Sequence, residues 1–516
     1  MNDPNGPMYF NGIYHLFYQY NPTGPLFTNQ MHWGHSASYD LINWISLDLA
    51  LAPTDPFDTN SCWSGSATIL PGNKLYTGID SENRQVQNLA VPKDLSDPYL
   101  REWVKYTGNP VMDLPEGIQP HNFRDPTTGW LGEDGKWRVI VGSETKDKAG
   151  VAFLYHSKDF VSWTKIDSPL YEAAGTGIWE CPDFFPVWID GKKGVETSVM
   201  NPSVKHVLKM GLVDQGKDYY LIGNYSSENE NYVPENELTL NTSRFDYGKY
   251  YASKSFFDPV KERRILIAWV TESDSEADFE VKGWAGLQSF PRSLWLDQNQ
   301  KQLIQWPIEE IETLHENEEV RFQDKKLENG SLHEVVGITA DQADVKISFK
   351  LSNLEEAEEW DPSWMDDKQF ISIKKDAPNK GKFGPFGLLA LASKDLTEQT
   401  AVFFRVFRNK GRYVVVMCSD QSRSSTKDGI DKSTYAAFVD IDPEKEEISL
   451  RTLIDHSIVE SFGGGGKTCI TARAHPTLAI GKDARLFVFN DGIESVLISE
   501  LSAWSLKKAV INVEDH

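Results

Sequence analysis

The segment Ser38-Tyr-Asp-Leu-Ile-Asn-Trp44 returns later in the chain as Ser157-Lys-Asp-Phe-Val-Ser-Trp163, and Ser96–Trp103 is a looser copy. Elsewhere a Gly followed by alternating aromatic and aliphatic residues recurs, at Gly12–Tyr18, Gly135–Val141 and Gly216–Ile222. Each such stretch predicts a turn followed by a strand. Short strands with turn signals and a recurring aromatic motif are typical of a β-propeller. The alternative is a β-rich domain with coincidental similarity.

The pattern changes near Gln305–His315, where Ile308, Ile311 and Leu314 fall at helical spacing. A polar stretch follows, and the alternating segments beyond it predict an antiparallel β-sandwich. No long amphipathic helix is present in the sequence. We therefore expect an all-β protein with a propeller over residues 1–306, a short helix and linker over 307–330, and a β-sandwich over 331–516.

Composition excludes several classes of protein. The 516 residues include 52 Lys plus Arg and 76 Asp plus Glu, which gives a net charge of −24. Nucleic acids and anionic membranes bind a basic face, so neither is expected as a partner. No apolar run approaches the ~18 residues of a membrane span. Charged residues at 25% and aromatic residues at 12% exclude a disordered chain.

Three sequons begin at Asn224, Asn241 and Asn329, and they favour a secreted chain that carries N-glycans. Met1 is followed at once by a turn, without a basic and then apolar leader. Two interpretations are open: a protein that needs no targeting, and a secreted chain whose natural sequence began earlier. The sequons favour the second.

The cysteines allow two readings. Cys418 and Cys469 lie near the ends of predicted strands in the second half of the chain. In a secreted protein they are expected to form a disulfide, and two buried thiols are an equal alternative. Cys62 and Cys181 belong to separate motifs and are expected to be free.

Three acidic residues occupy short, turn-rich contexts. Asp3 lies in Asn2-Asp-Pro-Asn-Gly6, Asp125 in Phe123-Arg-Asp-Pro126, and Glu180 in Trp179-Glu-Cys-Pro-Asp183. A single Asp in such a context is usually a turn-capping residue. Equivalent positions of successive propeller blades converge on the central axis, so three matching contexts predict that these carboxylates meet in one pocket.

A pocket of carboxylates and aromatic residues suits glycoside chemistry. One carboxylate attacks the anomeric carbon, and a second, kept protonated by burial, donates a proton to the leaving oxygen. Arg124 can hold a carboxylate or sugar hydroxyls in fixed geometry. Trp33 and Trp63 are candidates for stacking on sugar faces.

Two other motifs are not expected to be functional. Gly463–Thr468 resembles a phosphate loop, but Ser461 stands where that loop needs its first Gly, so a turn is predicted. His32 and His35 have metal-ligand spacing without a partner pair, so no metal site is expected. No cofactor is expected.

The three acidic motifs together resemble the signature blocks of glycoside hydrolase family 32, the plant invertase and fructosyltransferase family. The similarity continues through Gly65–Leu70, Tyr250–Lys254, Gly283–Gly286 and Asp455–Phe462, so it spans essentially the whole chain. The resemblance implies a five-bladed β-propeller joined to a β-sandwich, and a retaining mechanism. It implies Asp3 as nucleophile, Glu180 as acid/base and Asp125 as transition-state stabiliser. The matching pocket residues are Asn2, Gln19, Trp63, Ser64 and Arg124.

The sequence departs from the invertases of this family at the pocket rim. Phe27 stands where they have a Trp, in a loop one residue longer. Invertases also carry an Asp-x-x-Lys couple that grips the glucose of sucrose. Asp214-Gln-Gly-Lys217 keeps that spacing, but Val213 shifts it by one residue, so either Gln215 or Lys217 pairs with Asp214.

Hydrolysis and transfer differ only in which hydroxyl reaches the fructosyl-enzyme, and positioning an acceptor can outcompete water. The altered rim therefore favours a fructosyltransferase that builds fructan from sucrose, in particular a sucrose:fructan 6-fructosyltransferase. Invertase and fructan exohydrolase are the alternatives, followed by a non-catalytic sugar-binding protein. The expected partners are sucrose and fructo-oligosaccharides. A pI of about 4.9 favours the vacuole over the acidic cell wall, with the apoplast as the alternative location.

Overall fold

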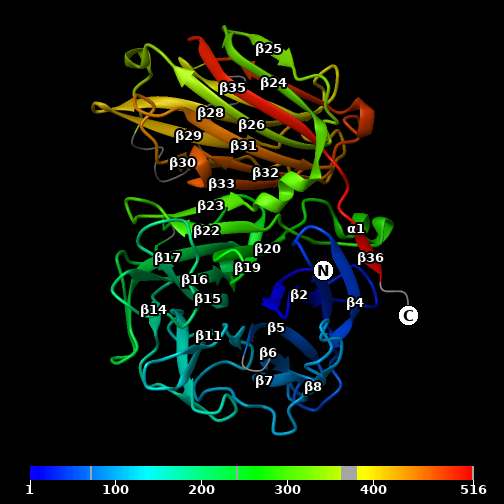
Figure 1. The fold of residues 1–516 in the computed structure, drawn as a ribbon, viewed down its shortest axis with the longest axis vertical. Coiled ribbons are helices and arrows are strands. Elements are labelled where there is room, and N and C mark those ends of the chain that lie inside the picture. Colours follow the sequence, from blue (N-terminus) through cyan, green and yellow to red (C-terminus); the bar gives the residue numbers. More distant parts are fainter. Residues whose placement is uncertain (29, 70–72, 240–241, 362–380, 514–516) are drawn as a thin grey trace.

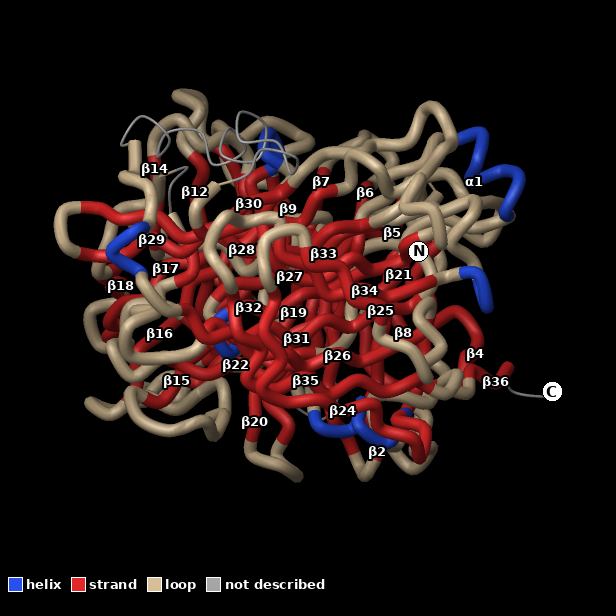
Figure 2. The backbone as a smooth tube through the Cα atoms, turned by 90° about the horizontal axis from the view of Figure 1, so that it is seen from above, coloured by secondary structure: helices blue, strands red, loops and turns tan. Residues whose placement is uncertain are grey.

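The computed structural model describes residues 1–28, 30–69, 73–239, 242–361 and 381–513. Figure 1 shows two all-β parts, with the first 300 or so residues below and most of the remainder above. Among the described residues the single α-helix is α1 (Glu276–Lys282), which lies at the periphery of the molecule (Figure 2). It begins with a capping box at Ser275 and ends at Gly283 in the left-handed region. No described helix has the length and apolar character needed to cross a membrane.

Five sheets are formed by the described residues up to Pro307, with one strand added from the C-terminal end. The first contains β1 (Pro4–Phe10), β2 (Ile13–Tyr20), β3 (His32–Ser38), β4 (Trp44–Leu51) and β36 (Ile511–Val513); the second β5 (Ser61–Thr68), β6 (Asn73–Ile79), β7 (Gln85–Pro92) and β8 (Trp103–Lys105). The third contains β9 (Phe123–Arg124), β10 (Trp130–Leu131), β11 (Trp137–Glu144), β12 (Gly150–Ser157), β13 (Trp163–Lys165) and β14 (Tyr171–Ala173). The fourth contains β15 (Trp179–Trp188), β16 (Val204–Leu212), β17 (Lys217–Ser226) and β18 (Asn231–Pro234); the fifth β19 (Tyr250–Asp258), β20 (Arg263–Val270), β21 (Leu287–Gln288), β22 (Arg292–Leu296) and β23 (Leu303–Pro307).

These sheets follow one another around a ring. Strand β1 contacts β5, β5 contacts β9, β11 contacts β15, and β15 contacts β19. Strand β19 contacts β1, which closes the ring. The sequence prediction of a propeller is therefore consistent with the order of the sheets, and the ends of β1, β9, β15 and β19 carry the residues singled out above.

The two close copies of the repeated motif form the same turn, between β3 and β4 in the first sheet and between β12 and β13 in the third. Asp40 Oδ1 accepts hydrogen bonds from the backbone N–H groups of Ile42 and Asn43, at 2.9 and 2.7 Å. Asp159 Oδ1 accepts the equivalent bonds from Val161 and Ser162, again at 2.9 and 2.7 Å. The repeat thus reflects one local turn chemistry, in which the Asp side chain caps the backbone.

The second part is a sandwich of two six-stranded sheets. One contains β24 (His315–Leu327), β35 (Val496–Leu506), β26 (Gln342–Leu351), β31 (Ile448–Asp455), β32 (Ile458–Gly463) and β33 (Thr468–Arg473); the other β25 (Ser331–Glu334), β34 (Arg485–Asn490), β27 (Phe383–Ala392), β28 (Thr400–Asn409), β29 (Arg412–Asp420) and β30 (Tyr435–Val439). The alternating apolar residues of both sheets meet in one core that includes Val345, Phe386, Phe404 and Ile454. Short 3-10 helices occupy Val213–Gln215, Glu309–Leu314, Leu354–Glu356, Gly464–Gly466 and Gly481–Asp483.

The segment 307–330 differs from the predicted helix and linker. Its helical turn is the 3-10 helix Glu309–Leu314, in which Ile311 is buried, but the polar stretch that follows is strand β24. Strand β24 lies at the edge of its sheet, and β35 is its one partner among the strands that the structure describes. Charged side chains are common on edge strands because they prevent pairing with other chains, so a polar sequence did not reveal this strand. At the C-terminal end, the chain leaves the sandwich after β35, and β36 pairs in parallel with β4 of the first sheet.

The predicted disulfide is wrong, because Cys418 and Cys469 are free, buried thiols. Cys418 on β29 packs with Trp360 and Phe403 on one side of the sandwich. Cys469 on β33 packs with Ile311, among residues that join the sandwich to the propeller. The two side chains therefore belong to different cores, in different sheets.

The sequons have different settings. Asn224 is exposed on β17, and Asn329 is exposed in the turn between β24 and β25. Asn241 lies outside the described residues.

Candidate active site

A cavity of about 920 Å³ lies at the N-terminal ends of the inner strands. Its lining includes all three acids of the sequence motifs. The lining residues used below are Asn2, Asp3, Gln19, Phe27, Trp63, Ser64, Arg124, Asp125, Glu180, Tyr251 and Trp269. The volume is at the upper end of the ~300–1,000 Å³ that small-molecule sites occupy.

Local irregularities of the inner strands aim these side chains at the cavity. The pairing register shifts between Asn5 and Met8 on β1 and between Glu180 and Asp183 on β15. It also shifts on β5, and on β19 just after Tyr251. Bulges bend a strand and redirect its side chains, and they are frequent next to active sites. The Pro residues that follow the acids in the sequence fit such interrupted pairing, because Pro cannot donate to the ladder.

Asp3 is held by hydrogen bonds to both of its oxygens. Ser64 Oγ donates to Oδ2 at 2.6 Å, and the Asn2 side-chain amide donates to Oδ1 at 3.2 Å. Burial raises the pKa of Asp3, and the Ser64 hydrogen bond opposes that shift. Both contacts favour the ionised carboxylate, which is the form that can attack carbon.

Cys181 links the other two motifs to Asp3. Its backbone N–H donates to Asp125 Oδ2 at 2.8 Å. Its thiol Sγ lies 3.5 Å from Oδ2 of both Asp3 and Asp125. Burial raises the pKa of this thiol well above its ordinary value, so Cys181 is a neutral donor between two carboxylates.

Asp125 is buried and sits at a positive φ of 64°. Its own N–H donates to Thr77 Oγ1 at 2.8 Å. A non-glycine residue keeps this backbone conformation only where its surroundings fix it, and such residues cluster at functional sites.

Glu180 is the acid most strongly affected by its surroundings. Tyr251 OH donates to Oε1 at 2.6 Å, and Arg124 Nη1 donates to Oε2 at 3.3 Å. Burial raises the pKa of Glu180 to about 7, Arg124 opposes the shift, and the nearby Asp125 and Asp3 add to it. A carboxylic acid that stays protonated to near neutral pH is what a general acid requires.

Arg124 also connects the acids to the aromatic wall. Its guanidinium lies 4.9 Å from the centroid of the Trp63 ring, and its Nε donates to Gln85 Oε1 at 3.3 Å. Phe27 stands edge-on to Trp63 with the ring centroids 6.4 Å apart, and it is 62% exposed. Trp33 does not stack on a ligand as expected: it is fully buried, and its indole N–H donates to the Trp63 carbonyl at 2.9 Å.

Gln19 is only 2% exposed, yet neither its amide oxygen nor its amide nitrogen has a hydrogen-bond partner among the described residues. The indole N–H groups of Trp63 and Trp269 are in the same situation. Buried polar groups are normally satisfied, so three unpaired groups around one cavity indicate a polar ligand with several hydroxyls.

The structure adds functional residues that the sequence reasoning missed. Tyr251 belongs to the quoted Tyr250–Lys254 stretch but was not identified as a site residue, and Cys181 was considered only as a thiol. Trp269 gave no sequence signal. All three became recognisable only from their contacts with the cavity or with the acids.

The structure does not bring Asp214, Gln215 or Lys217 to the cavity. Asp214 and Gln215 are exposed in the 3-10 turn between β16 and β17. The Lys217 ammonium donates to the carbonyl of Gly248, and burial lowers its pKa to about 8. None of the three lines the cavity.

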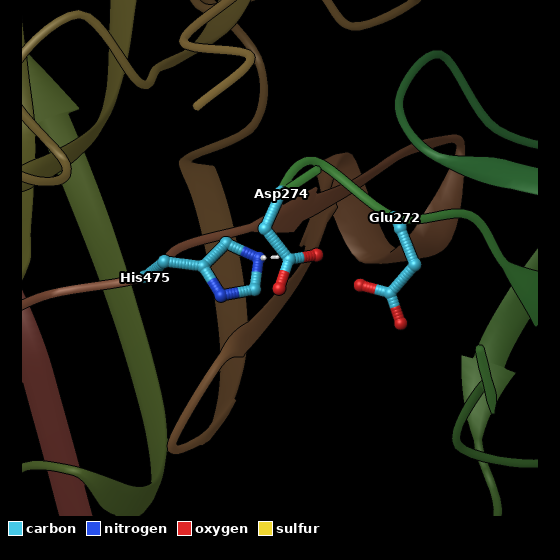
Figure 3. Close-up of side chains that lie close together, drawn as sticks. All are labelled: Glu272, Asp274 and His475. Carbon is cyan, nitrogen blue, oxygen red and sulfur yellow. Dashed lines mark ion pairs between the residues drawn. The ribbon is translucent and has the colours of Figure 1, made fainter. Parts of the chain in front are cut away.

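A second cluster of ionisable side chains contains Glu272, Asp274 and His475 (Figure 3). Two cations already meet its carboxylates: Lys282 Nζ lies 2.9 Å from Asp274 Oδ2, and Arg473 Nη1 lies 2.9 Å from Glu272 Oε2. The cluster is therefore an ion-pair network between the propeller and the sandwich.

His35 contacts His15, with their ring nitrogens 3.0 Å apart. Gly464–Gly466 forms the turn that the sequence predicted within Gly463–Thr468, and this turn joins β32 to β33.

One cavity thus holds the hydrogen-bonded carboxylate of Asp3, the carboxyl group of Glu180 with its raised pKa, and the carboxylate of Asp125. This set can carry out nucleophilic attack and proton donation at one glycosidic bond.

Comparison with known proteins assigns both parts of the chain to one family. Residues 1–307 match the glycosyl hydrolases family 32 N-terminal domain, and residues 310–505 match the family 32 C-terminal domain. The chain is 57% identical to the insoluble β-fructofuranosidase isoenzyme CWINV3 of Arabidopsis thaliana, across 99% of this chain and 88% of that protein. It is 54% identical to the fructan 6-exohydrolase of Beta vulgaris, across 99% and 86%.

Solved structures give the same result. The crystal structure of fructan 1-exohydrolase IIa from Cichorium intybus has a TM-score of 0.97 and 57% identity, covering 100% of this chain and 97% of that one. A variant of that enzyme in complex with 1-kestose matches equally well. The protein is therefore an enzyme of the glycosyl hydrolases family 32, to whose plant branch the chain belongs.

Proposed function

We propose that this fructosidase hydrolyses terminal fructosyl units from fructan, through a covalent fructosyl-enzyme and with retention of configuration. The observation that carries the proposal is the pairing of Asp3, hydrogen-bonded by Ser64 and Asn2, with Glu180, whose pKa is raised to about 7, in a single cavity. Asp3 is the nucleophile and Glu180 the acid/base.

In the first step an oxygen of Asp3 forms a bond to the anomeric carbon of fructose, and the glycosidic bond breaks. Glu180 gives its proton to the leaving oxygen, which departs as a hydroxyl. In the second step Glu180, now ionised, takes a proton from water, whose oxygen displaces Asp3. Positive charge builds up on the sugar ring in both steps, and the carboxylate of Asp125 stabilises it.

Sugar recognition falls to Asn2, whose amide also donates to Asp3, and to groups that have no hydrogen-bond partner among the described residues. Gln19, Asn2 and the indoles of Trp63 and Trp269 offer donors and acceptors for the hydroxyls of the fructosyl unit. Arg124 contacts both Glu180 and the ring of Trp63, and so fixes their relative positions. Phe27 provides an exposed aromatic edge at the rim for the remainder of the substrate.

Fructan is favoured over sucrose as the preferred substrate. The family resemblance assigns the grip on glucose to an Asp-x-x-Lys couple, but Asp214 and Gln215 are exposed and Lys217 is bonded to Gly248. Two relatives that match over nearly the whole chain are named fructan exohydrolases. Hydrolysis of sucrose is the second candidate, because other relatives are named β-fructofuranosidases.

Fructosyl transfer, expected from the altered rim, has less support. The relatives and solved structures described above are named as hydrolases, and no described residue of this chain is recognisable as an acceptor site. Transfer therefore remains a third reading, distinguished by its products.

We also propose five blades, one for each sheet up to Pro307, and a secretory route with the apoplast in place of the vacuole. The names of the relatives, which are insoluble isoenzymes, support the location. Exposed Asn224 and Asn329 are the proposed glycan carriers.

The test is to incubate the purified protein separately with sucrose, 1-kestose, inulin and levan, and to quantify free glucose and fructose. The proposal predicts fructose release from at least one fructan at a kcat/KM above that for sucrose. Glucose in excess of fructose, with growing oligosaccharides, would establish a transferase instead. Equal glucose and fructose from sucrose, without release from either fructan, would establish an invertase.

A further inference from the structure

A bulge in β15 creates the link between Glu180 and the other two acids. Glu180 pairs with Gly211 of β16, and the next pair along the strands is Asp183 with Lys209. Cys181 and Pro182 therefore stand opposite the single residue Met210. The extra residue is what allows Glu180 to enter the cavity while the N–H and thiol of Cys181 face Asp125 and Asp3.

This bulge is strained. Cys181 has a φ of 45°, in the left-handed region that a non-glycine residue adopts only where its surroundings hold it there. The surrounding structure must supply contacts that hold it. Two buried lysines do so, by binding the two consecutive carbonyls of the bulge.

Lys209 donates to the carbonyl of Cys181 at 2.7 Å, and Lys254 donates to the carbonyl of Pro182 at 2.9 Å. Lys209 is completely buried, and Lys254 is 1% exposed. A lysine is almost never buried to this degree unless its charge has partners, so each contact has a specific structural reason.

The Lys209 ammonium has two hydrogen-bond acceptors and one ion-pair partner. Besides the carbonyl of Cys181 it donates to the carbonyl of Ser253 at 2.8 Å, and its Nζ lies 3.2 Å from Asp218 Oδ2. Asp218 in turn accepts the N–H and the hydroxyl of Ser253, at 2.7 and 2.5 Å. Lys209 therefore connects β15 and β19 to β17, next to Cys181, which contacts Asp3 and Asp125.

We propose that Lys209 is a positioning residue for the reaction: by holding the Cys181 carbonyl it fixes the bulge that places Glu180 in the cavity and Cys181 against Asp3 and Asp125. Its buried positive charge also favours the ionised form of Asp3. This inference rests on the proposed roles of the three acids. It goes beyond them because Lys209 touches neither the cavity nor the substrate.

The charge effect has a definite sign. The titratable groups near Lys209 are Asp218 on β17, Asp183 and Cys181 on β15, Lys254 on β19, and the acids Asp3 and Asp125. Removing a cation next to carboxylates makes them easier to protonate. The acid limb of the pH profile of kcat/KM, which reports the ionisation of Asp3, must then move to higher pH.

The test uses the double substitution Lys209→Met with Asp218→Asn, which removes both charges together and leaves no unpaired buried charge. The control is Lys205→Met, four residues earlier on the same strand, whose ammonium pairs with Glu235 away from the acids. Each variant is measured for its melting temperature, for kcat and KM separately on the best substrate, and for the pH dependence of kcat/KM.

We expect the double variant to lose about 10²-fold in kcat, the penalty of misplacing a catalytic group by about 1 Å, with KM changed far less. Its acid limb moves to higher pH, because Lys209 acts on Asp3 more strongly than Asp218 does, and the control shows neither effect. If the double variant does not fold, Lys254→Met, which frees the adjacent Pro182 carbonyl, is expected to show a smaller loss of kcat in the same direction.

A folded double variant with the wild-type kcat and an unshifted acid limb would overturn the proposal, as would an unchanged kcat in Lys254→Met when that variant alone folds. Failure of the proposed function looks different, because wild-type protein would then release no fructose from 1-kestose, inulin or levan.

Discussion

The hydroxyl of Tyr251 donates a hydrogen bond of 2.6 Å to Oε1 of Glu180. The two residues stand on the first strands of adjacent sheets, Tyr251 on β19 and Glu180 on β15. This bond favours the ionised form of Glu180, whereas burial favours the protonated form, and burial dominates. The residue that acts as acid in one step and base in the next is thus poised between two opposing effects.

Replacing Tyr251 by Phe removes a stabilising contact of the ionised form. The pKa of Glu180 rises further, and the alkaline limb of kcat/KM moves up by about 0.5–1 pH unit, the equivalent of one hydrogen bond. The matched control is Tyr250→Phe, since Tyr250 faces Arg292, with the guanidinium 4.1 Å from its ring, and lies outside the cavity. An alkaline limb that stays in place in Tyr251→Phe would show that the bond does not tune the acid.

Glu180→Gln is expected to abolish fructose release and to stabilise the fold at neutral pH. The folded pKa of Glu180 is about 7, against an ordinary value of 4.5. Between about pH 4.5 and 7 the Glu180 carboxyl is ionised in the unfolded chain but still protonated in the folded protein. The free energy of unfolding of the wild-type protein therefore falls as the pH rises through this interval, and that of the amide variant does not. The melting temperature of the variant relative to wild type should rise across this interval. A difference that is constant with pH would contradict the raised pKa.

Gln19→Leu should separate binding from stability. The amide of Gln19 has no hydrogen-bond partner among the described residues, so its loss leaves none of their groups newly unpaired and does not lower the melting temperature. In the complex the same amide meets substrate hydroxyls, and kcat/KM should fall about 10–100-fold, corresponding to roughly 1–3 kcal/mol. Wild-type kcat/KM in this variant would remove Gln19 from the substrate site.

Asp214→Ala tests the exclusion of the exposed turn. Because Asp214 does not line the cavity, kcat and KM for sucrose and for fructan should each stay within about twofold of wild type. A rise in KM confined to sucrose would instead show that Asp214 reaches the glucose unit, and would favour the invertase reading.

The sequence revealed those parts of the structure that have a local cause. The Ser-x-Asp-φ-φ-x-Trp repeat marks real turns, because Asp40 and Asp159 cap the backbone within their own segments. Asp3, Asp125 and Glu180 were recognisable as a set because each lies at the end of a strand and is followed by Pro within two residues.

Features fixed by distant contacts were not recoverable. Strand β24 is hidden by the charged side chains that suit its edge position, and β36 crosses back to the first sheet. The sequence spacing of Cys418 and Cys469 is compatible with a disulfide and equally with two thiols in separate cores, so it does not distinguish the two. In the sequence Lys209 and Lys254 resemble surface lysines, because their burial results from the packing of β15, β17 and β19.

The most direct test of the account is to trap the intermediate on Asp3. A fructosyl donor with a leaving group that needs no proton is mixed with the Glu180→Gln variant, which forms the ester readily but lacks the base that hydrolyses it. Rapid quenching, digestion and mass spectrometry then locate the fructosyl group. We expect an adduct on Asp3 that is absent from the double variant Asp3→Asn with Glu180→Gln. An adduct on Asp125, or turnover of the donor without any adduct and with inversion at the anomeric carbon, would contradict it.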